Sequence, residues 1–240
     1  MDNVNDITGF QTLNILSEAD RFNKWMYDSI KKYAKGSVLE IGSGIGNISF
    51  HILSHFNHVY LTDYDADYCE LLRKKFGSNK NLKGISQMDL VDPEFDQKFG
   101  FLFNSFDTII ALNVIEHIKD DNLAIRNCKK LLRQQGNLIM LVPAYQWLYN
   151  KFDTNLGHFR RYNRTTIKNL VNAELRIISI YNFNAVAIPG WFISGRVLGK
   201  ETIPSGQVKL VERIVPVMKM ADRLLRNSVG LSVIAIGEKA

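Results

Sequence analysis

The 240-residue chain is 46% hydrophobic, 11% aromatic and 22% charged, with a formal net charge of +6. This composition is typical of a globular domain and excludes a disordered or fibrous protein. The two cysteines, Cys69 and Cys128, form no metal-binding or redox spacing, which argues against a disulfide framework and indicates a reducing, cytoplasmic compartment. We expect neither a signal peptide nor a membrane span, because the chain does not open on a basic segment and contains no run of about 18 apolar residues.

The positive charge is concentrated in the second half of the chain. Residues 151–240 carry an excess of eight positive charges, and residues 1–150 sum to −2. Such an asymmetry favours an anionic partner for the C-terminal part. A basic surface that is merely solvated is the alternative, and the sequence leaves both open.

Hydrophobic periodicity predicts helices alternating with short strands along the first 142 residues. The helices are expected at 13–33, 47–55, 66–76 and 120–132, with another entered near residue 115, and the strands at 37–42, 59–62, 82–87, 106–112 and 137–142. After Pro143 a polar and aromatic segment leads to a helix beginning near Thr165 and to strands at 175–183 and 231–236. This alternation predicts a doubly wound α/β fold with a mostly parallel sheet.

A glycine-rich loop follows the first predicted strand. Glycines at 42, 44 and 46 let the backbone turn tightly and approach a ligand closely. The dinucleotide fingerprint expects a further glycine at position 47, which is Asn. Glu40, two residues before the first glycine, would repel a pyrophosphate but suits a ligand that bears an ammonium and a sulfonium. A glycine-rich turn without a ligand is the alternative.

Polar side chains end the next predicted strands. Asp63 can accept hydrogen bonds from both hydroxyls of a ribose. Asp89 could accept one from an adenine amino group, with Met88 and Leu90 flanking the ring. Asn113 ends the fourth strand, which lies next to the first in a doubly wound sheet. Together these strand ends are more specific than the glycines alone.

Glu40-Ile-Gly-Ser-Gly-Ile-Gly46, Asp63, Asp89 and the segment Phe106–His117 resemble the class I S-adenosylmethionine-dependent methyltransferases, in particular a bacterial type 11/12-like subgroup. The resemblance covers about residues 37–142. It implies a seven-stranded sheet whose last strand is antiparallel, and it implies S-adenosylmethionine as cofactor with S-adenosylhomocysteine as product. The cofactor-binding residues would be Glu40, Gly42, Ser43, Gly44, Asp63, Tyr64, Asp89, Leu90, Asn113 and, in the N-terminal cap, Trp25. Plain helix packing is the alternative for Trp25.

The resemblance also divides the chain, which we expect to form a single domain. Residues 1–36 would be cap helices, 37–142 the cofactor-binding core, 143–184 a substrate-side segment, 185–229 an α-helical insertion and 230–240 the last strand.

The substrate side is expected after the fifth strand, where the segment Gly157–Tyr162 is dense in functional side chains. His158 suits a general base near neutral pH, with Tyr162 as a second catalytic group. Arg160 and Arg161 can grip a phosphate or carboxylate in a bidentate manner. Substrate contacts are also expected from Tyr145 and His117. The alternatives are that the arginines pair with acids and that His117 positions a helix.

The insertion at 185–229 contains an apolar, aromatic stretch broken by Pro189 and Gly190, a turn at 202–206 and a basic amphipathic helix over 208–225 that bends at Pro216. It could form a lid over the substrate site, a homodimer seam, or a peripheral contact with the inner membrane face. The sequence leaves these three open.

The sequence thus predicts methyl transfer to an oxygen, or a nitrogen, of a small molecule, sugar or lipid-linked glycan of anionic character. A similar histidine-arginine string occurs in bacterial methyltransferases associated with lipid-linked glycan pathways. A cofactor-binding or nucleic-acid-binding module without turnover and a nucleotide-dependent oxidoreductase are the rival functions. No nucleic acid is expected as partner, and no metal site is evident, because residues 143–162 offer Asp153 as their single acid.

Overall fold

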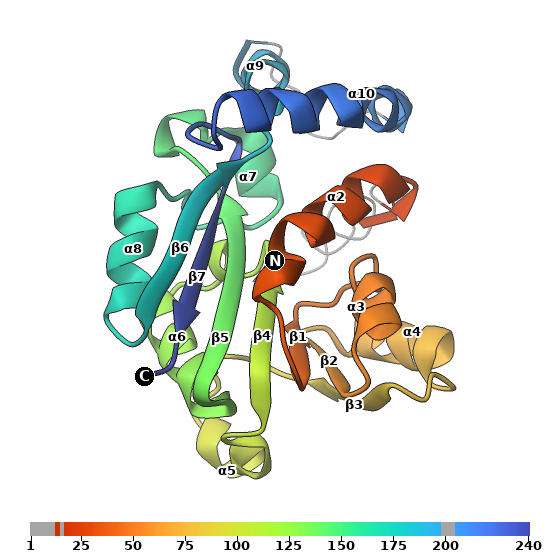
Figure 1. Ribbon diagram of the computed structural model, residues 1–240, viewed down its shortest axis with the longest axis vertical. Coiled ribbons are helices and arrows are strands. Elements are labelled where there is room, and N and C mark those ends of the chain that lie inside the picture. The colour runs from red at the N-terminus through yellow and green to blue at the C-terminus, as the bar shows by residue number, and fades with distance from the viewer. Residues whose placement is uncertain (1–12, 15–16, 198–204) are drawn as a thin grey trace.

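A computed structural model describes residues 13–14, 17–197 and 205–240, and its centre is one twisted seven-stranded sheet (Figure 1). The strand order is β3-β2-β1-β4-β5-β7-β6, with β1 to β5 parallel and β7 antiparallel to both of its neighbours. This arrangement confirms the predicted fold class. The strands are β1 (Val38–Ile41), β2 (Val59–Asp63), β3 (Leu82–Gln87), β4 (Phe106–Leu112), β5 (Leu132–Pro143), β6 (Arg176–Phe183) and β7 (Ser232–Glu238).

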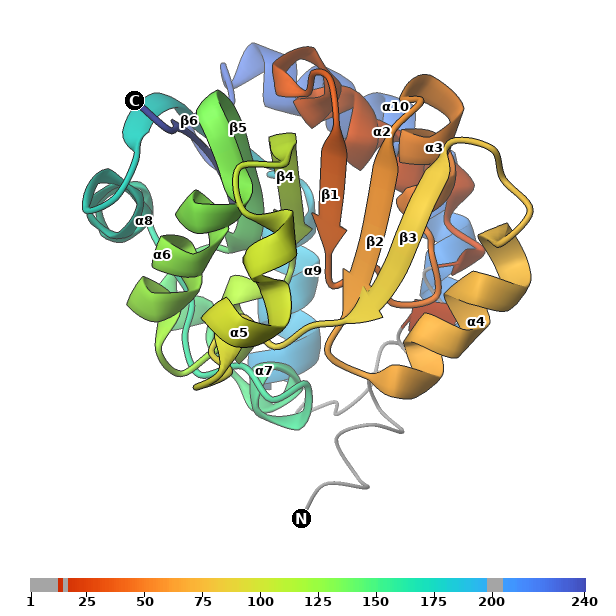
Figure 2. The same ribbon diagram turned by 90° about the horizontal axis from the view of Figure 1, so that it is seen from below.

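Helices cover both faces of the sheet and enclose two hydrophobic cores (Figures 1 and 2). One face packs under α2 (Asp20–Ile30), α3 (Ser49–His55), α4 (Ala66–Phe76) and α10 (Ser205–Leu224). The other face packs under α5 (Phe95–Phe99), α6 (Asp121–Leu131) and α8 (Arg164–Asn172). Central strands buried on both faces read as continuous apolar runs, as in β4, because helices exclude water from either side.

The predicted elements are present, with four differences. The expected helix over 13–33 is interrupted at Glu18 and Ala19, so that α2 begins at Asp20, and it ends in a 3-10 turn, Lys31–Tyr33. Residues 115–117 form a 3-10 turn instead of opening a long helix. β5 begins five residues earlier than predicted. A short helix, α9 (Ala187–Phe192), runs through Pro189, because a proline in the first turn of a helix removes no intrahelical hydrogen bond. The predicted turn at 202–206 lies partly outside the described residues, and Ser205 already begins α10.

The carboxyl ends of the parallel strands share one edge of the sheet. In Figure 2, α9 and a short helix α7 (Lys151–Asn155) lie toward the edge to which the arrowheads of β1 and β2 point. The strand order reverses between β1 and β4, and ligands of open α/β sheets bind at such a switch point. Within the described part of the chain, no helix has both the length and the apolar character that crossing a bilayer requires.

Candidate active site

The glycine loop after β1 adopts a conformation that favours glycine. Gly42 and Gly44 have φ angles of 69° and 52°, in the left-handed region that costs side-chain-bearing residues energy. A Cβ on Gly42 would lie 2.4 Å from Val114, and one on Gly44 would lie 3.0 Å from Leu13. The loop is tied to the end of β2, since the Gly44 amide donates a 2.7 Å hydrogen bond to Asp63. The loop is therefore packed against Val114 and Leu13 and fixed to the end of β2.

Glu40 and Ser43 place polar groups inside the protein beside this loop. Both residues are buried, and the Ser49 hydroxyl donates a hydrogen bond to the Glu40 carboxylate. Burial raises the pKa of Glu40 to about 7, although the hydrogen bond from Ser49 opposes that shift. The buried Ser43 side chain lies beside the same carboxylate and, like Ser49, acts to lower its pKa.

Asp63 lies buried at the end of β2, where two backbone amides orient it. Its Oδ2 accepts from Gly44 and its Oδ1 accepts from Asp65 at 3.0 Å. Burial raises its pKa, against the effect of these hydrogen bonds. The next side chain, Tyr64, is 71% exposed. An oriented carboxylate with free lone pairs beside an exposed ring suits a ribose.

The other strand-end residues lie where the sequence predicts them. Asp89 follows β3 and accepts a 2.9 Å hydrogen bond from the amide of Val91, and Leu90 is buried. Asn113 follows β4 with a φ of 55°, and its backbone N–H donates to the carbonyl of Leu141. A non-glycine residue in this region is uncommon and clusters at functional sites.

Trp25 is placed in the packing between α2 and β6. It is 7% exposed, and its ring centroid lies 4.3 Å from that of Phe183 and 5.8 Å from that of Phe22. These contacts are those of helix packing, the alternative considered for Trp25, and cofactor binding by Trp25 stays a prediction. Its aromatic surface is used to attach the N-terminal helix to the sheet.

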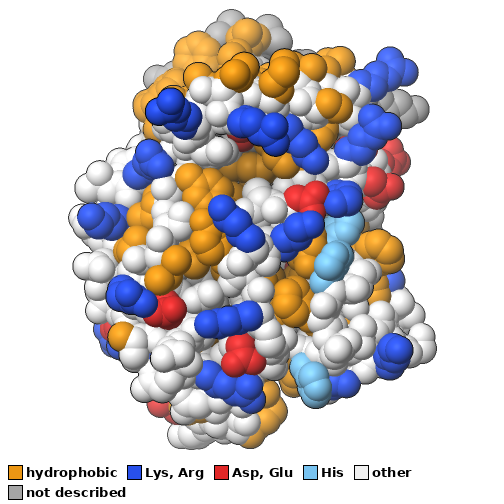
Figure 3. Space-filling view, in the orientation of Figure 1, with side chains coloured by type: hydrophobic (Ala, Val, Ile, Leu, Met, Phe, Trp, Pro, Cys, Tyr) orange, Lys and Arg blue, Asp and Glu red, His pale blue; other side chains and the backbone are white. Residues whose placement is uncertain are grey.

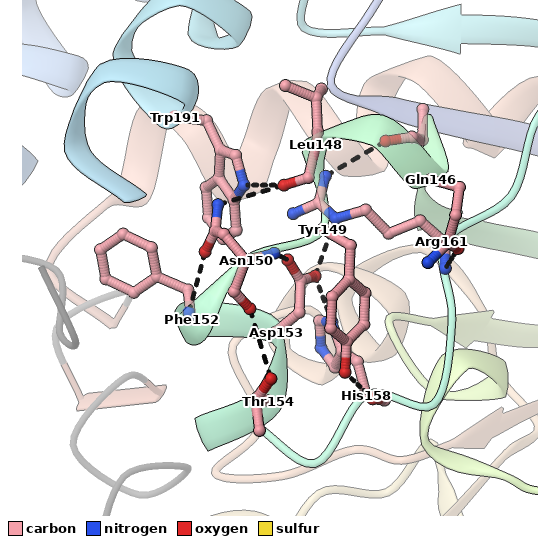
Figure 4. A network of polar contacts seen from close by, with 11 residues as sticks. Gln146, Leu148, Tyr149, Asn150, Phe152, Asp153, Thr154, His158, Arg161 and Trp191 are labelled. Atoms are coloured by element: carbon pink, nitrogen blue, oxygen red, sulfur yellow. Dashed lines mark hydrogen bonds and ion pairs between the residues drawn. The ribbon is translucent and has the colours of Figure 1, made fainter. Parts of the chain in front are cut away.

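Asp153, on α7, is the centre of a polar network on the substrate side (Figure 4). Its Oδ1 accepts from Nδ1 of His158 and from Nε of Arg161, both at 2.8 Å, and its Oδ2 accepts from the amide of Asn150 at 3.0 Å. Although burial alone would raise it, the hydrogen bond from His158 and the charge of Arg161 hold the pKa of Asp153 below its ordinary value.

The contacts of Arg161 and Tyr162 correct two expectations. The Arg161 side chain is 1% exposed, donates to the carbonyl of Ala144 and stacks on Trp191 at 4.6 Å. The Tyr162 hydroxyl donates to Asp121 at 2.8 Å. Burial and Asp121 raise the pKa of Tyr162 above its ordinary value, which disfavours acid-base work. Both side chains therefore position the segment and offer no free group to an acceptor.

Arg160 and Tyr145 keep part of their surface accessible. The Arg160 side chain is 28% exposed and binds Asp121 at 2.6 Å and the carbonyl of Lys119 at 2.7 Å. Tyr145 has a φ of 64°, and its ring stacks against the half-exposed Trp147. Substrate contact by Arg160 and Tyr145 stays a prediction, as do the role of His117 in substrate binding and that of His158 in catalysis.

The tertiary structure brings His158 against Glu116 and His117, which follow β4. The two imidazole rings meet edge to face with centroids 4.6 Å apart. Desolvation and the neighbouring His158 lower the pKa of His117, although part of this residue is exposed. Glu116 is 0% exposed, and neither of its carboxylate oxygens has a hydrogen-bond partner among the described residues. Burial raises its pKa to about 8.

Sequence reasoning missed Glu116 and underrated Asp153. The signal for Glu116 was an acid set between apolar residues, Val114, Ile115 and Ile118, directly after a buried strand. Asp153 was visible as the one acid of its segment, but nothing in the sequence placed it beside both His158 and Arg161.

Comparisons with known proteins agree with this geometry. A model of the family described as methyltransferase domain matches residues 39–138. A S-adenosylmethionine-dependent methyltransferase from Archaeoglobus fulgidus superposes with a TM-score of 0.61 at 14% identity, covering 92% of this chain and 94% of that one. Residues 39–138 are thus a methyltransferase domain, and the fold of the chain is that of class I S-adenosylmethionine-dependent methyltransferases.

Two more solved structures resemble this methyltransferase. A phosphoethanolamine N-methyltransferase 2 from Haemonchus contortus, in complex with S-adenosylhomocysteine, superposes with a TM-score of 0.62 at 17% identity, covering 98% of this chain and 58% of that one. The CurJ carbon methyltransferase superposes with a TM-score of 0.56 at 16% identity, and the match covers 94% of this chain and 55% of that one.

Among curated proteins, the methyltransferase is similar to parts of much longer chains. It is 26% identical over 151 residues to the hybrid PKS-NRPS synthetase iccA of Talaromyces variabilis, which covers 55% of this chain and 4% of that one. It is also 26% identical over 173 residues to the polyketide synthase ThaQ of Burkholderia thailandensis, and this match covers 64% of this chain and 8% of that one. The chain therefore spans less than a tenth of the length of these relatives.

The residues of the glycine loop and strand ends fit S-adenosylmethionine. The glycine loop lies beside the oriented Asp63 carboxylate and the exposed Tyr64 ring, at the switch point of the sheet. The carboxylates of Glu40 and Asp63 suit the ammonium and ribose of the cofactor. When bound, this cofactor supplies a methyl group already activated on a sulfonium, so the protein contributes alignment and activation of the acceptor.

Proposed function

We propose that this methyltransferase transfers the methyl group to an oxygen of a small or lipid-linked acceptor that carries negative charge. The observation that supports this is that His158 lies against Glu116 and His117. These two residues follow β4, at the edge of the sheet where Asn113 lies. A hydroxyl is a poor nucleophile until its proton is weakened, and this is the group of side chains that can do so.

His158 is the central residue of the proposed activating group. Because Asp153 accepts from its Nδ1, the ring is fixed in orientation and Nε2 is the nitrogen left to face the acceptor. Arg161, bound to the same carboxylate oxygen, keeps Asp153 ionised. Partly exposed Arg160 is the residue that we assign to the acceptor's negative charge.

A carbon acceptor is the second candidate. The similarity to polyketide synthases and to a carbon methyltransferase supports it. The same group of side chains would then weaken a proton on carbon beside a carbonyl. The position of the transferred methyl group in the product, on oxygen or on carbon, distinguishes the two.

The outer surface of α10 supports an acceptor with a lipid tail. The two acids of this helix are turned inward onto backbone amides: Glu212 accepts from Arg21 and Phe22, and Asp222 accepts from Asn184 and Ala185. The apolar side chains left on the outside are more than half exposed, and they are Leu210, Val217, Met220 and Leu224.

Basic side chains flank this apolar stripe. Arg213, Lys219 and Arg223 are exposed and form no ion pair with the residues that the structure describes. Figure 3 shows hydrophobic and basic side chains together along the upper edge, over α10. An exposed apolar stripe edged by positive charge is the pattern that favours an anionic membrane surface. A second copy of the chain on the stripe is the alternative.

The test combines cofactor binding with transfer. Titration should show binding of S-adenosylmethionine and S-adenosylhomocysteine, with NAD as a control that does not bind. The labelled methyl group should then move to hydroxyl-bearing anionic acceptors, lipid-linked glycans first. His158→Asn should retain cofactor affinity and lose transfer by about 100-fold or more, whereas His55→Asn, on α3, should change neither. Transfer at the wild-type rate in His158→Asn would contradict the assignment.

A further inference from the structure

Glu116, His117 and His158 bring three metal-ligating side chains to one point. Each offers one ligand atom, and these atoms lie within 4.8 Å of one another. Glu116 and His117 come from the 3-10 turn after β4, and His158 comes from the loop after α7, more than 40 residues away. The Phe159 amide, which donates to the carbonyl of Glu116 at 2.8 Å, fixes one segment against the other.

The two histidines are oriented as metal ligands are. His158 donates through Nδ1 to a buried carboxylate, Asp153, and this leaves Nε2 free. A carboxylate behind a histidine is the usual outer partner of a ligating imidazole, because it fixes the ring and raises its basicity. His117 hydrogen-bonds to the backbone of Leu156, which leaves its second nitrogen for a ligand.

Glu116 is the independent observation that points to a missing ligand. It is 0% exposed, and both of its carboxylate oxygens lack a partner among the described residues. Buried carboxylates are ordinarily paired, hydrogen-bonded or bound to a metal.

We propose that Glu116, His117 and His158 bind one divalent cation of the Zn²⁺ or Fe²⁺ class. Two imidazoles and one carboxylate are a ligand set that these metals prefer. Three protein ligands leave at least one coordination position open. His117 is an exposed residue, so solvent reaches part of the proposed site.

The use of the cation rests on the proposed function. A metal-bound hydroxyl has a lowered pKa and releases its proton to water. Its oxygen then forms a bond to the methyl carbon, the bond from that carbon to sulfur breaks, and the electron pair stays on sulfur. His158 would hold the cation through Nε2 in this state, and the cation would do the work first expected of a histidine base.

The test is a titration of the full chain with ZnCl₂ after treatment with a chelator. Calorimetry should show one equivalent bound, and Co²⁺ in its place should give the visible absorption of a four- or five-coordinate site. Glu116→Gln and His158→Asn should each weaken Zn²⁺ binding by at least 100-fold. Asp153→Asn, which removes the outer partner, should weaken it by about 10- to 100-fold.

A second histidine pair supplies the matched control. His51 and His55 lie four residues apart on α3, and such a pair can bind Zn²⁺ weakly by itself. The double variant His51→Gln/His55→Gln should leave the one-equivalent site unchanged. Absence of stoichiometric binding in the wild type, or unchanged binding in Glu116→Gln, would overturn the proposal.

Titration with S-adenosylhomocysteine on the same samples separates this proposal from the proposed function. Cofactor binding without Zn²⁺ binding overturns the metal site alone. Undiminished transfer by protein that has been shown to be metal-free overturns the use of the cation. Loss of transfer on chelation that is restored by one equivalent of metal supports it.

Discussion

Asp153 and His158 are joined by a 2.8 Å hydrogen bond between Oδ1 and Nδ1, inside a network from which solvent is nearly excluded. The same oxygen accepts from Arg161, so one carboxylate both orients the imidazole and neutralises a buried guanidinium. The stability of the segment after β5 and the direction of His158 thus depend on a single side chain.

Asp153→Asn should destabilise the protein by about 3–5 kcal/mol, because it leaves the charge of Arg161 buried without its partner. Urea unfolding followed by circular dichroism measures this. Asp96→Asn is the control, since it removes an exposed partner of Lys130 and should cost less than about 1 kcal/mol. Equal effects of the two substitutions would show that the Asp153 network does not stabilise the fold.

Asp63→Asn should weaken S-adenosylhomocysteine binding by about 10- to 100-fold, since a hydrogen bond to a charged group contributes roughly 1.5–3 kcal/mol. Asp65→Ala is the matched control two residues away. Its carboxylate caps α4 by accepting from the Asp67 amide, so its loss should cost about 1 kcal/mol of stability and leave affinity unchanged. If calorimetry finds unchanged S-adenosylhomocysteine affinity in Asp63→Asn and weakened affinity in Asp65→Ala, the assignment of the ribose to Asp63 is refuted.

Glu40→Gln should change how stability depends on pH. The pKa of Glu40 is raised from 4.5 to about 7 in the folded protein, so between these values the folded state binds more protons than the unfolded state. The contribution of Glu40 to stability is therefore greatest below pH 4.5 and is lost as the pH rises toward 7.

Glutamine has no such titration, so Glu40→Gln should gain stability relative to the wild type by up to roughly 3 kcal/mol between pH 5 and 8. The measurement is urea unfolding of both ligand-free proteins at several pH values. If the free energies of unfolding of the two proteins depend on pH in the same way across this range, the Glu40 carboxyl titrates normally.

Replacement of Arg213, Lys219 and Arg223 by glutamine should weaken binding to phosphatidylserine-containing vesicles by about 100-fold, since each basic residue near such a surface contributes roughly 1 kcal/mol. Co-sedimentation with these vesicles and with purely zwitterionic ones measures this. Substitution of Lys74, Lys80 and Lys83, around α4 and β3, is the control. Failure of the wild type to bind vesicles while it sediments as a dimer would favour a second copy of the chain on α10.

Most of the cofactor half of the site could be predicted from the sequence. The residues that matter there, such as Gly42, Asp63 and Asp89, each follow directly on a strand whose apolar run is visible in the chain. The sequence did not decide the place of Trp25, because an aromatic side chain on an amphipathic helix can pack on a ligand or on a residue such as Phe183.

The substrate half could not be predicted to the same degree. The sequence singled out residues 158–162 as a candidate substrate segment. The contacts of Arg161 and Tyr162, however, depend on Asp153 and Asp121, which approach them only in the folded chain. The sequence does not distinguish an arginine whose guanidinium is free from one whose guanidinium is buried in an ion pair.

The sequence by itself determined the order of strands and helices, the glycine loop and the class of cofactor, because these depend on local periodicity and on residues that adjoin each other in the chain. The tertiary structure decided that Glu116 would lie buried without a partner beside His158. That contact joins segments more than 40 residues apart, and it exists because parallel strands place their carboxyl ends, and the loops that follow them, at one edge of the sheet.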